Sequence, residues 1–186
     1  MLNDLRCKLK YLVDKYLSDV PKYTIDGPRH DGLYTLTIEN GECIPLLYWR
    51  FERRFTELRN TTIDGTLNDI RSIRVVHAAH TSVPIDFLMY KELDICMFLA
   101  DSEVESIFNS ANGNCAANLI VRLQNGVLCI IELSASLPEN AQEIDKHIII
   151  SRSGLASDMV VDTQIRQNSI YLYKNNEKHR EYTDVD

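Results

Sequence analysis

Two histidines, His77 and His80, lie three residues apart near the end of a stretch that is typical of a β-strand. With Cys96 or Asp86 as a further ligand, such a pair would have the nitrogen, sulfur and oxygen donors that a metal ion needs. Residues three apart on a strand, however, point to opposite faces of the sheet. We therefore interpret both histidines as structural, and the sequence predicts no metal site.

A second candidate is the segment 49–59, which combines four arginines with three aromatic side chains. Basic and aromatic residues in alternation are typical of a phosphate or nucleic-acid site. Glu52 and Glu57 dilute this charge, so the solvated face of an amphipathic helix is the interpretation that we prefer. For an anionic sugar as ligand, Arg50 and Arg54 would be the first contacts, because guanidinium groups bind such anions in bidentate geometry.

Composition restricts the class of protein that can carry these residues. The chain has 186 residues, of which 45% are hydrophobic and 25% charged, as in an average globular domain. One folded unit is the default at this length. The net charge of −7 would repel a polyanion. We therefore expect no nucleic-acid partner.

The cysteines and the hydropathy pattern bear on location. The five cysteines are odd in number and widely spaced, which favours reduced thiols. No apolar run approaches the roughly 20 residues of a membrane span, and the N-terminus does not have the pattern of a signal peptide. We expect a cytoplasmic protein that does not contact a membrane.

The first part of the chain predicts a helix and a hairpin. Leucines at steps of three and four indicate an amphipathic helix, so we assign residues 1–22 to an N-terminal helix. Residues 23–45 form a hairpin or loop that leads into the main domain. Within this region Asn40-Gly41 favours a turn between strands at Leu33–Ile38 and Cys43–Trp49, with Pro45 on an edge strand.

The centre of the chain predicts a short helix, a strand and a long helix, in that order. Arg50–Asn60 is compatible with a helix, and Ile70–Ala79 has the β-branched composition of a strand. Apolar residues at helical spacing then indicate a buried helix over Pro84–Ala100. Pro84 suits its first turn, and Ser82 or Thr81 would be the N-cap.

The strongest local signal is a β-hairpin. Asn125-Gly126 separates the apolar runs 119–124 and 127–133, and this dipeptide is typical of a two-residue type I′ turn. Such a turn would place Leu123 opposite Leu128. Further strands are predicted at 102–109, 146–151 and 169–173, and residues 175–186 read as a charged, flexible tail.

Four local motifs in this order resemble the C-terminal domain of the glucose-fructose oxidoreductase, inositol dehydrogenase and rhizopine catabolism (Gfo/Idh/MocA) family. They are Tyr48–Phe55, Asp64–Ile73, Met89–Ile95 and Asn118–Ser134. The resemblance covers about residues 46 to 173 and implies an oxidoreductase-like domain over 46–174. The implied fold is α+β, an open, mainly antiparallel sheet with helices on one face, like the C-terminal domain of dihydrodipicolinate reductase.

The same resemblance implies where catalytic residues would lie. The catalytic histidine of the family falls on Lys91, and an aspartate three residues later is retained as Asp94. A histidine with a pKa near ~6.5 exchanges protons at neutral pH, whereas a lysine near ~10.4 stays charged unless burial lowers its pKa. An ion-paired Lys91 beside Glu92 or Asp94 is the structural alternative. Asp86, one place out of register, is a further candidate for substrate contact.

The family's cofactor-binding half has no counterpart in this sequence. A Rossmann domain carries a Gly-x-Gly-x-x-Gly turn, and no two of the seven glycines are two residues apart. The catalytic lysine of the family would lie in that half. We therefore expect no cofactor bound by this chain alone, with NAD(P) present only if a separate Rossmann partner exists.

Three functions remain open from the sequence. The first is a substrate-side and oligomerisation domain of a sugar or cyclitol oxidoreductase-like protein, which is not catalytic by itself. The resemblance implies a homodimer through the sheet and a small sugar-like ligand. The second is a split oxidoreductase that a separate Rossmann domain completes. The third is an unrelated α+β module for a small ligand, so whether the chain is an enzyme stays undecided.

Overall fold

The computed structural model describes residues 2–16, 22–27, 33–158, 170–174 and 177–181. The chain forms two compact units, residues 1–48 and 49–186. The expected helix at 1–22 and the expected lead-in at 23–45 thus belong to one unit.

The first unit packs one helix against a small antiparallel sheet. Helix α1 (Leu2–Tyr16) precedes β1 (Tyr23–Asp26), β2 (Tyr34–Ile38) and β3 (Cys43–Leu46), and the strand order is β1-β2-β3. Their common core comprises Leu9, Val13, Ile25, Tyr34 and Leu36. The structure confirms a helix within the predicted range 1–22, of which residues 1 and 17–21 lie outside the described residues. The β2–β3 hairpin is confirmed too, but its second strand ends at Leu46 and not at Trp49. Pro45 lies on the edge strand β3, where the missing N–H leaves no ladder bond unmade.

Within its described residues, the second unit contains two α-helices and one large sheet. After a 3-10 turn, η1 (Tyr48–Phe51), come α2 (Arg53–Ile63), β4 (Ile70–His80) and α3 (Ile85–Ala100). The remaining strands are β5 (Val104–Asn112), β6 (Ala116–Leu123), β7 (Leu128–Leu137), β8 (Ile144–Ser151), β9 (Gly154–Ser157), β10 (Ile170–Lys174) and β11 (Glu177–Glu181).

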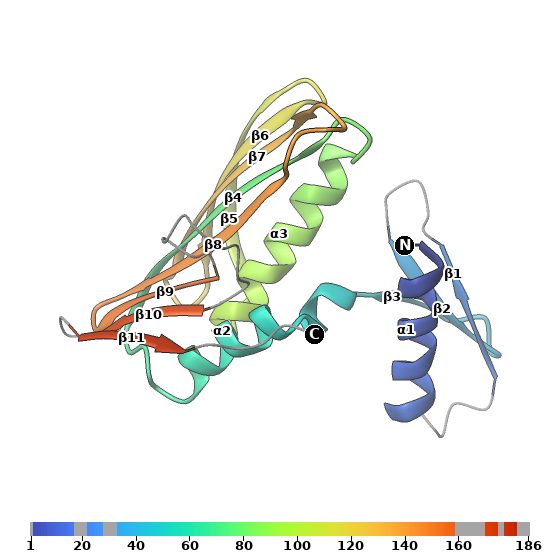
Figure 1. Cartoon of the computed structure of the whole chain (residues 1–186), viewed down its shortest axis with the longest axis horizontal. Coiled ribbons are helices and arrows are strands. Elements are labelled where there is room, and N and C mark those ends of the chain that lie inside the picture. The colour runs from blue at the N-terminus through green and yellow to red at the C-terminus, as the bar shows by residue number, and fades with distance from the viewer. Residues whose placement is uncertain (1, 17–21, 28–32, 159–169, 175–176, 182–186) are drawn as a thin grey trace. The chain divides into compact units, whose positions relative to one another are not determined.

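The large sheet is open and mainly antiparallel, as the sequence predicts. Its order is β11-β10-β9-β8-β4-β7-β6-β5, and β4 with β7 is the parallel pair among the described strands. Figure 1 shows α2 and α3 on one face of this sheet. A large sheet flanked by the helix at 84–100 is the feature that separates the oxidoreductase-like fold from the third alternative, the unrelated module.

Helix α3 begins differently from the prediction. Pro84 itself is the N-cap residue, in an extended conformation, and no side chain caps the helix. The expected caps Ser82 and Thr81 precede it and lie in the turn that follows β4. The helix ends at Ala100, and the C-cap residue Asp101 donates its N–H to the carbonyl of Met97. The left-handed conformation of Asp101 lets the N–H of Ser102 reach the same carbonyl at 3.2 Å.

The hairpin between β6 and β7 has a longer loop than the sequence predicts. Leu123 donates its N–H to the carbonyl of Val127 (3.0 Å), so three residues form the loop instead of two. Gly126 takes a φ of 85°, and the Asn125 side chain accepts the N–H of Val127. A three-residue loop that ends in a left-handed glycine is the next most common hairpin connection. The predicted pairing of Leu123 with Leu128 is therefore wrong by one residue.

This one-residue shift reverses which side chains face the helices, because side chains alternate along a strand. Val121 lies opposite Cys129, and Ile120 lies opposite Ile130. Cys129 and Ile131 are buried in the core together with Val121.

The C-terminal segment 175–186, expected to be a charged tail, contains a strand. Strand β11 lies within this segment and pairs with β10.

None of the helices in the described part of the chain has the length and the apolar character needed to cross a membrane.

Candidate functional site

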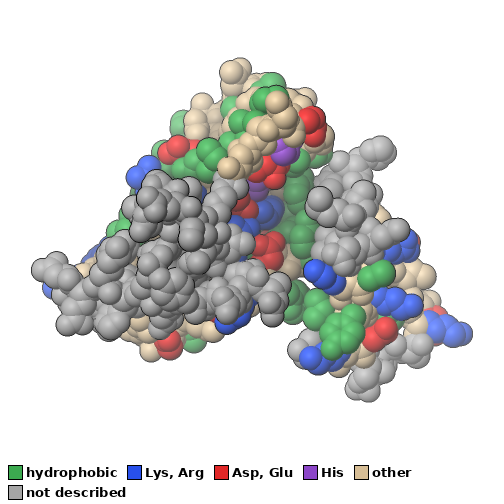
Figure 2. All heavy atoms as spheres, viewed as in Figure 1, with side chains coloured by type: hydrophobic (Ala, Val, Ile, Leu, Met, Phe, Trp, Pro, Cys, Tyr) green, Lys and Arg blue, Asp and Glu red, His purple; other side chains and the backbone are tan. Residues whose placement is uncertain are grey.

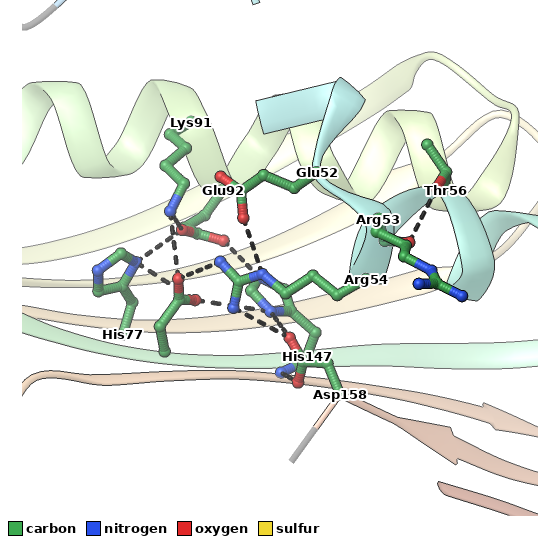
Figure 3. Close-up of polar contacts among 10 residues, drawn as sticks. Glu52, Arg53, Arg54, Thr56, His77, Lys91, Glu92, His147 and Asp158 are labelled. Atoms are coloured by element: carbon green, nitrogen blue, oxygen red, sulfur yellow. Dashed lines mark hydrogen bonds and ion pairs between the residues drawn. The ribbon is translucent and has the colours of Figure 1, made fainter. Parts of the chain in front are cut away.

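A group of eight charged or titratable side chains lies between the helices and the sheet of the second unit. We call it the acid–base cluster; it comprises Glu52, Arg54, His77, Lys91, Glu92, Asp145, His147 and Asp158. Figure 3 shows the labelled members converging from α2, α3 and the sheet. In Figure 2, acidic, basic and histidine side chains gather at one place on the surface of this unit.

Strand alternation and register bring the sheet residues together. Asp145 and His147 are two residues apart on β8, so both point to the same face. His77 on β4 is the direct partner of Asp145, and Val75 is the partner of His147. These polar side chains replace apolar residues on the helix-covered face, and helix α3 places Glu92 above them.

The deepest part of the cluster is a chain of four hydrogen-bonded side chains. Asp158 Oδ2 lies 2.7 Å from His147 Nδ1, His147 Nε2 lies 2.7 Å from Glu92 Oε2, and Glu92 Oε1 lies 2.7 Å from His77 Nδ1. A neutral imidazole has one N–H, so His147 can donate to both carboxylates only as an imidazolium.

The pKa values of His147 and Glu92 shift in the directions that these contacts require. Burial alone would lower the pKa of His147, but Asp158 and Glu92 outweigh burial and raise it to about 10. Burial would raise the pKa of Glu92, but His147 and His77 hold it well below its ordinary value. His147 and Glu92 are therefore both ionised at neutral pH.

The outer part of the cluster is organised around Asp145. Its Oδ2 accepts from Arg54 Nη2 (2.6 Å) and from Lys91 Nζ (3.3 Å). Although burial would raise the pKa of Asp145, these two cations and His147 lower it. The other oxygen, Oδ1, is buried without a hydrogen-bond partner.

Lys91 and Arg54 are held in their charged forms. Burial would lower the pKa of Lys91, but Glu92 and Asp145 outweigh it and raise that pKa. The same competition raises the pKa of Arg54, through Asp145, Glu52 and Asp158. In this setting Lys91 is a hydrogen-bond donor rather than a proton acceptor, because the condition under which it would act as a base, a lowered pKa, is not met.

Exposure increases outward across the cluster. Side-chain exposure is 0% for Glu92 and His147, 10% for Lys91, 20% for Arg54, 22% for Asp145 and 37% for Glu52. The inner groups set geometry and charge, while the outer ones reach solvent. Together these outer donors and acceptors can bind a ligand that carries hydroxyl or anionic groups.

The structure brings together some of the predicted site residues and separates others. Lys91 and Arg54 both bind Asp145 in the cluster. Asp94 instead accepts hydrogen bonds from the indole of Trp49 (2.7 Å) and from Arg50 Nε (2.8 Å), in a separate, half-buried ion pair.

Asp86 and the remaining arginines also lie outside the cluster. Asp86 is exposed in the first turn of α3. Arg59 binds Asp101, and Arg53 binds Glu57. Each described arginine of the 49–59 segment therefore pairs with an acidic residue, which accords with a charged helix face. His80 pairs with Glu143 instead of joining His77 in the cluster.

Sequence reasoning missed three members of the cluster, Asp145, His147 and Asp158. It named Glu92 only as an ion-pair partner of Lys91, a pair that the structure contains at 3.4 Å. The available signal was the polar pair Asp145 and His147 on one face of a strand whose next residues are three isoleucines. Charged residues are seldom buried unless they are paired, so that pattern indicates a partner across the sheet or on a helix.

Comparisons with known proteins were made with both sequence and structure. No family model matches the sequence, and no curated protein matches it significantly. Solved oxidoreductase structures do match the fold. An oxidoreductase from Sinorhizobium meliloti aligns over 72% of this chain and 41% of its own, with a TM-score of 0.61 and 11% identity.

Two further matches have more specific descriptions. UDP-N-acetylglucosamine 3-dehydrogenase from Acidithiobacillus ferrooxidans aligns over 74% of this chain and 44% of its own, with a TM-score of 0.54 and 15% identity. GenD2 from gentamicin A biosynthesis, solved in complex with NAD, aligns over 60% and 38%, with a TM-score of 0.51 and 10% identity. The chain spans less than half the length of these proteins. At such identities the likeness establishes an oxidoreductase-like fold.

Proposed function

We propose that the second unit is the substrate-side domain of a Gfo/Idh/MocA-like oxidoreductase and binds a small polyhydroxylated ligand at the outer part of the acid–base cluster. The observation that carries this proposal is the position of Lys91. The sequence resemblance aligns it with a catalytic residue, and its side chain lies in a partly open group of charged donors and acceptors.

The chemistry of the outer cluster suits a sugar or cyclitol. Hydroxyl groups both donate and accept hydrogen bonds, and the cluster offers ammonium and guanidinium donors beside the carboxylates of Glu52 and Asp145. Charged hydrogen-bonding groups give such a ligand orientation as well as affinity. Arg50 and Asp86, the other predicted contacts, lie apart from Lys91 and are secondary candidates.

In this proposal the chain is not a complete catalyst by itself. Hydride transfer would require NAD(P) from a Rossmann domain, and a split oxidoreductase completed by such a partner is the alternative function. The charge of Lys91 supports a binding role, since the neighbouring carboxylates raise its pKa and so keep it a cation. We also propose a cytoplasmic location, because all five cysteines are free thiols.

The test is ligand binding by the purified chain. We expect myo-inositol or UDP-N-acetylglucosamine to raise the melting temperature saturably, because a ligand of the folded state stabilises it. Lys91→Met should weaken that binding by about tenfold, the loss of one charged hydrogen bond. Lys146→Met is the matched control, because Lys146 lies on the opposite face of β8 from Asp145 and His147.

The outcomes separate the proposed role from its alternatives. No shift with any polyol, or equal losses in both lysine variants, would refute a ligand site at the cluster. A saturable shift with NAD(H) or NADP(H) near millimolar concentration would show that this chain binds cofactor without a Rossmann partner. No shift with either nucleotide is the result that we expect.

We also propose a homodimer through the open face of the large sheet. The exposed fraction is 67% for Phe108 and 48% for Ile120, and these residues are direct partners across β5 and β6. Ile130 on β7 continues this apolar row. Exposed apolar patches of this kind are typical of interaction surfaces.

A second copy of the chain fits this face because the charges around the row are of both signs. Arg122 lies 3.0 Å from Glu105, and Arg74 lies 3.6 Å from Glu132. Under two-fold symmetry each patch meets its own copy, so a face with balanced charges around an apolar centre is complementary to itself.

Sedimentation velocity tests the dimer. Ile120→Glu should convert a dimer to a monomer, whereas Ile63→Glu should not, since Ile63 is similarly exposed (57%) but lies on α2. A monomer at all concentrations, or a dimer that survives Ile120→Glu, would refute this interface.

A further inference from the structure

We propose that His77, Glu92 and Asp145 form a binding site for a divalent transition-metal ion, best represented by Zn²⁺, for which the Lys91 ammonium competes. The proposed ligands do not include His80, the residue that its spacing in the sequence suggests as a second ligand beside His77. The site also does not depend on the proposed polyol ligand, because metal binding is measured without one.

The donor atoms are close enough to share one ion. One ligand atom from each residue lies within 4.8 Å of the others. His77 Nδ1 is 2.7 Å from Glu92 Oε1 and 3.7 Å from Asp145 Oδ1. Zinc bonds of about 2.0–2.2 Å in tetrahedral geometry place ligand atoms roughly 3.4 Å apart. Rotamer-scale adjustments therefore suffice to enclose an ion.

The donor set matches the chemistry of a transition metal better than that of a hard cation. One imidazole nitrogen and two carboxylate oxygens suit Zn²⁺ or Mn²⁺, whereas Ca²⁺ and Mg²⁺ prefer oxygen donors alone. Three protein ligands leave one tetrahedral position open, as in zinc sites that bind water or a substrate. The residues beside this position are Lys91 and Arg54, the outer part of the cluster.

The charges of the cluster leave room for one more positive charge. Glu52, Glu92, Asp145 and Asp158 are four carboxylates, whereas Arg54, Lys91 and the doubly bonded His147 are three cations. The carboxylates of the cluster therefore outnumber these cations by one. A divalent ion at the place of the Lys91 ammonium would add one further positive charge.

The unsatisfied atom of the cluster marks where that charge is missing. Asp145 Oδ1 is buried and accepts no hydrogen bond, an arrangement that is costly without a ligand or ion. It lies 3.7 Å from His77 Nδ1, the nitrogen that would ligate the metal, and 3.6 Å from His147 Nδ1. Lys91 Nζ lies only 3.4 Å from Glu92 Oε1 and 3.3 Å from Asp145 Oδ2, so the ammonium occupies the position of a bridging cation.

The ligands are supported from behind, as in established metal sites. Glu92 presents Oε1 to the site because Oε2 is held by His147, which Asp158 orients in turn. His77 and Asp145 are cross-strand partners, so the sheet fixes their separation. Such supporting contacts typically determine ligand orientation and affinity.

The experiment is a Zn²⁺ titration of the full chain against a chromophoric chelator. Exposed thiols also bind zinc, so Cys7, Cys43 and Cys115 are first replaced by serine. We expect one Zn²⁺ per chain. His77→Ala should weaken binding by about tenfold or more, whereas His80→Ala, the matched histidine control, should leave it unchanged.

Lys91→Met provides the measurement that misfolding cannot mimic. Removing the competing charge should tighten Zn²⁺ binding by roughly tenfold, because a like charge a few ångströms away opposes the metal. Tighter binding in this variant together with its loss in His77→Ala would establish the site. Absence of stoichiometric binding in Lys91→Met, or equal affinity in His77→Ala and His80→Ala, would overturn the proposal.

Discussion

Replacing Glu92 by glutamine tests whether the buried core of the acid–base cluster stabilises the second unit. Each oxygen of Glu92 receives a hydrogen bond, Oε1 from His77 and Oε2 from His147, and the side chain is fully buried. Glutamine keeps the shape but has one acceptor and one NH₂ group. One imidazole N–H would then face a donor, and the His147 imidazolium would keep Asp158 as its remaining carboxylate partner.

The expected loss is large because the partners stay buried. Removing one member of a buried ion pair costs about 3–5 kcal/mol. Since Asp158 still holds His147, we expect a value near the lower end, about 3 kcal/mol. With a urea m-value of about 1–3 kcal/mol/M, the unfolding midpoint should fall by roughly 1–3 M. The measurement is urea unfolding with chelator present, followed by the fluorescence of Trp49, the single tryptophan.

The control is Glu132→Gln on the outer face of β7. Glu132 pairs with Arg74 at 3.6 Å, and both side chains are about half exposed, at 49%. Such a pair contributes less than about 1 kcal/mol. If Glu92→Gln unfolded at the same urea concentration as Glu132→Gln, the hydrogen-bonded chain from Asp158 to His77 would not stabilise the fold.

Three further substitutions test separate parts of the structure. Asp94→Ala removes the carboxylate that accepts the buried indole N–H of Trp49, so it should lower the free energy of unfolding by about 1–3 kcal/mol and change the Trp49 emission. The control Asp86→Ala, at an exposed position, should change neither. Equal effects of the two variants would contradict a structural role for Asp94. Gly126→Ala should lower the free energy of unfolding by about 1 kcal/mol because of its φ of 85°, and Gly126→Asn by less. Equal unfolding midpoints for the two variants in chemical denaturation would contradict a left-handed conformation at Gly126. Gly27→Ala should destabilise the first unit, since a Cβ there would lie 2.8 Å from the Leu33 carbonyl oxygen. The unfolding of the second unit, followed by Trp49 fluorescence, should not change. A shifted Trp49 transition would show that the two units unfold together.

Local patterns in the sequence were sufficient for the helices and most of the strands, but they missed β1, β9 and β11. The apolar spacing of residues 85–100 and the β-branched run at 70–79 depend on neighbours a few positions away, so they predict α3 and β4 well. The resemblance of four motifs then pointed to an oxidoreductase-like sheet, and the solved structures that match share that fold.

Register was beyond the reach of these patterns. Asn125-Gly126 is compatible with both a two-residue and a three-residue loop, and the choice depends on contacts outside the hairpin. The Asn125 side chain donates to the Ala100 carbonyl at the end of α3, and its backbone N–H donates to Ser102. These partners are more than 20 residues away in sequence, and they favour the longer loop that places Cys129 in the core.

The sequence by itself determined the helices, most strands, and the candidacy of Lys91, Arg54 and Asp94. Only the tertiary structure decided which of these residues act together. Strand pairing places His77 opposite Asp145, and the packing of α3 brings Lys91 and Glu92 to them, while Asp94, one turn along the same helix, joins Arg50 instead. The physical reason is that ion pairs form between side chains that meet in space, and the cluster unites residues separated by up to 106 positions of chain between Glu52 and Asp158.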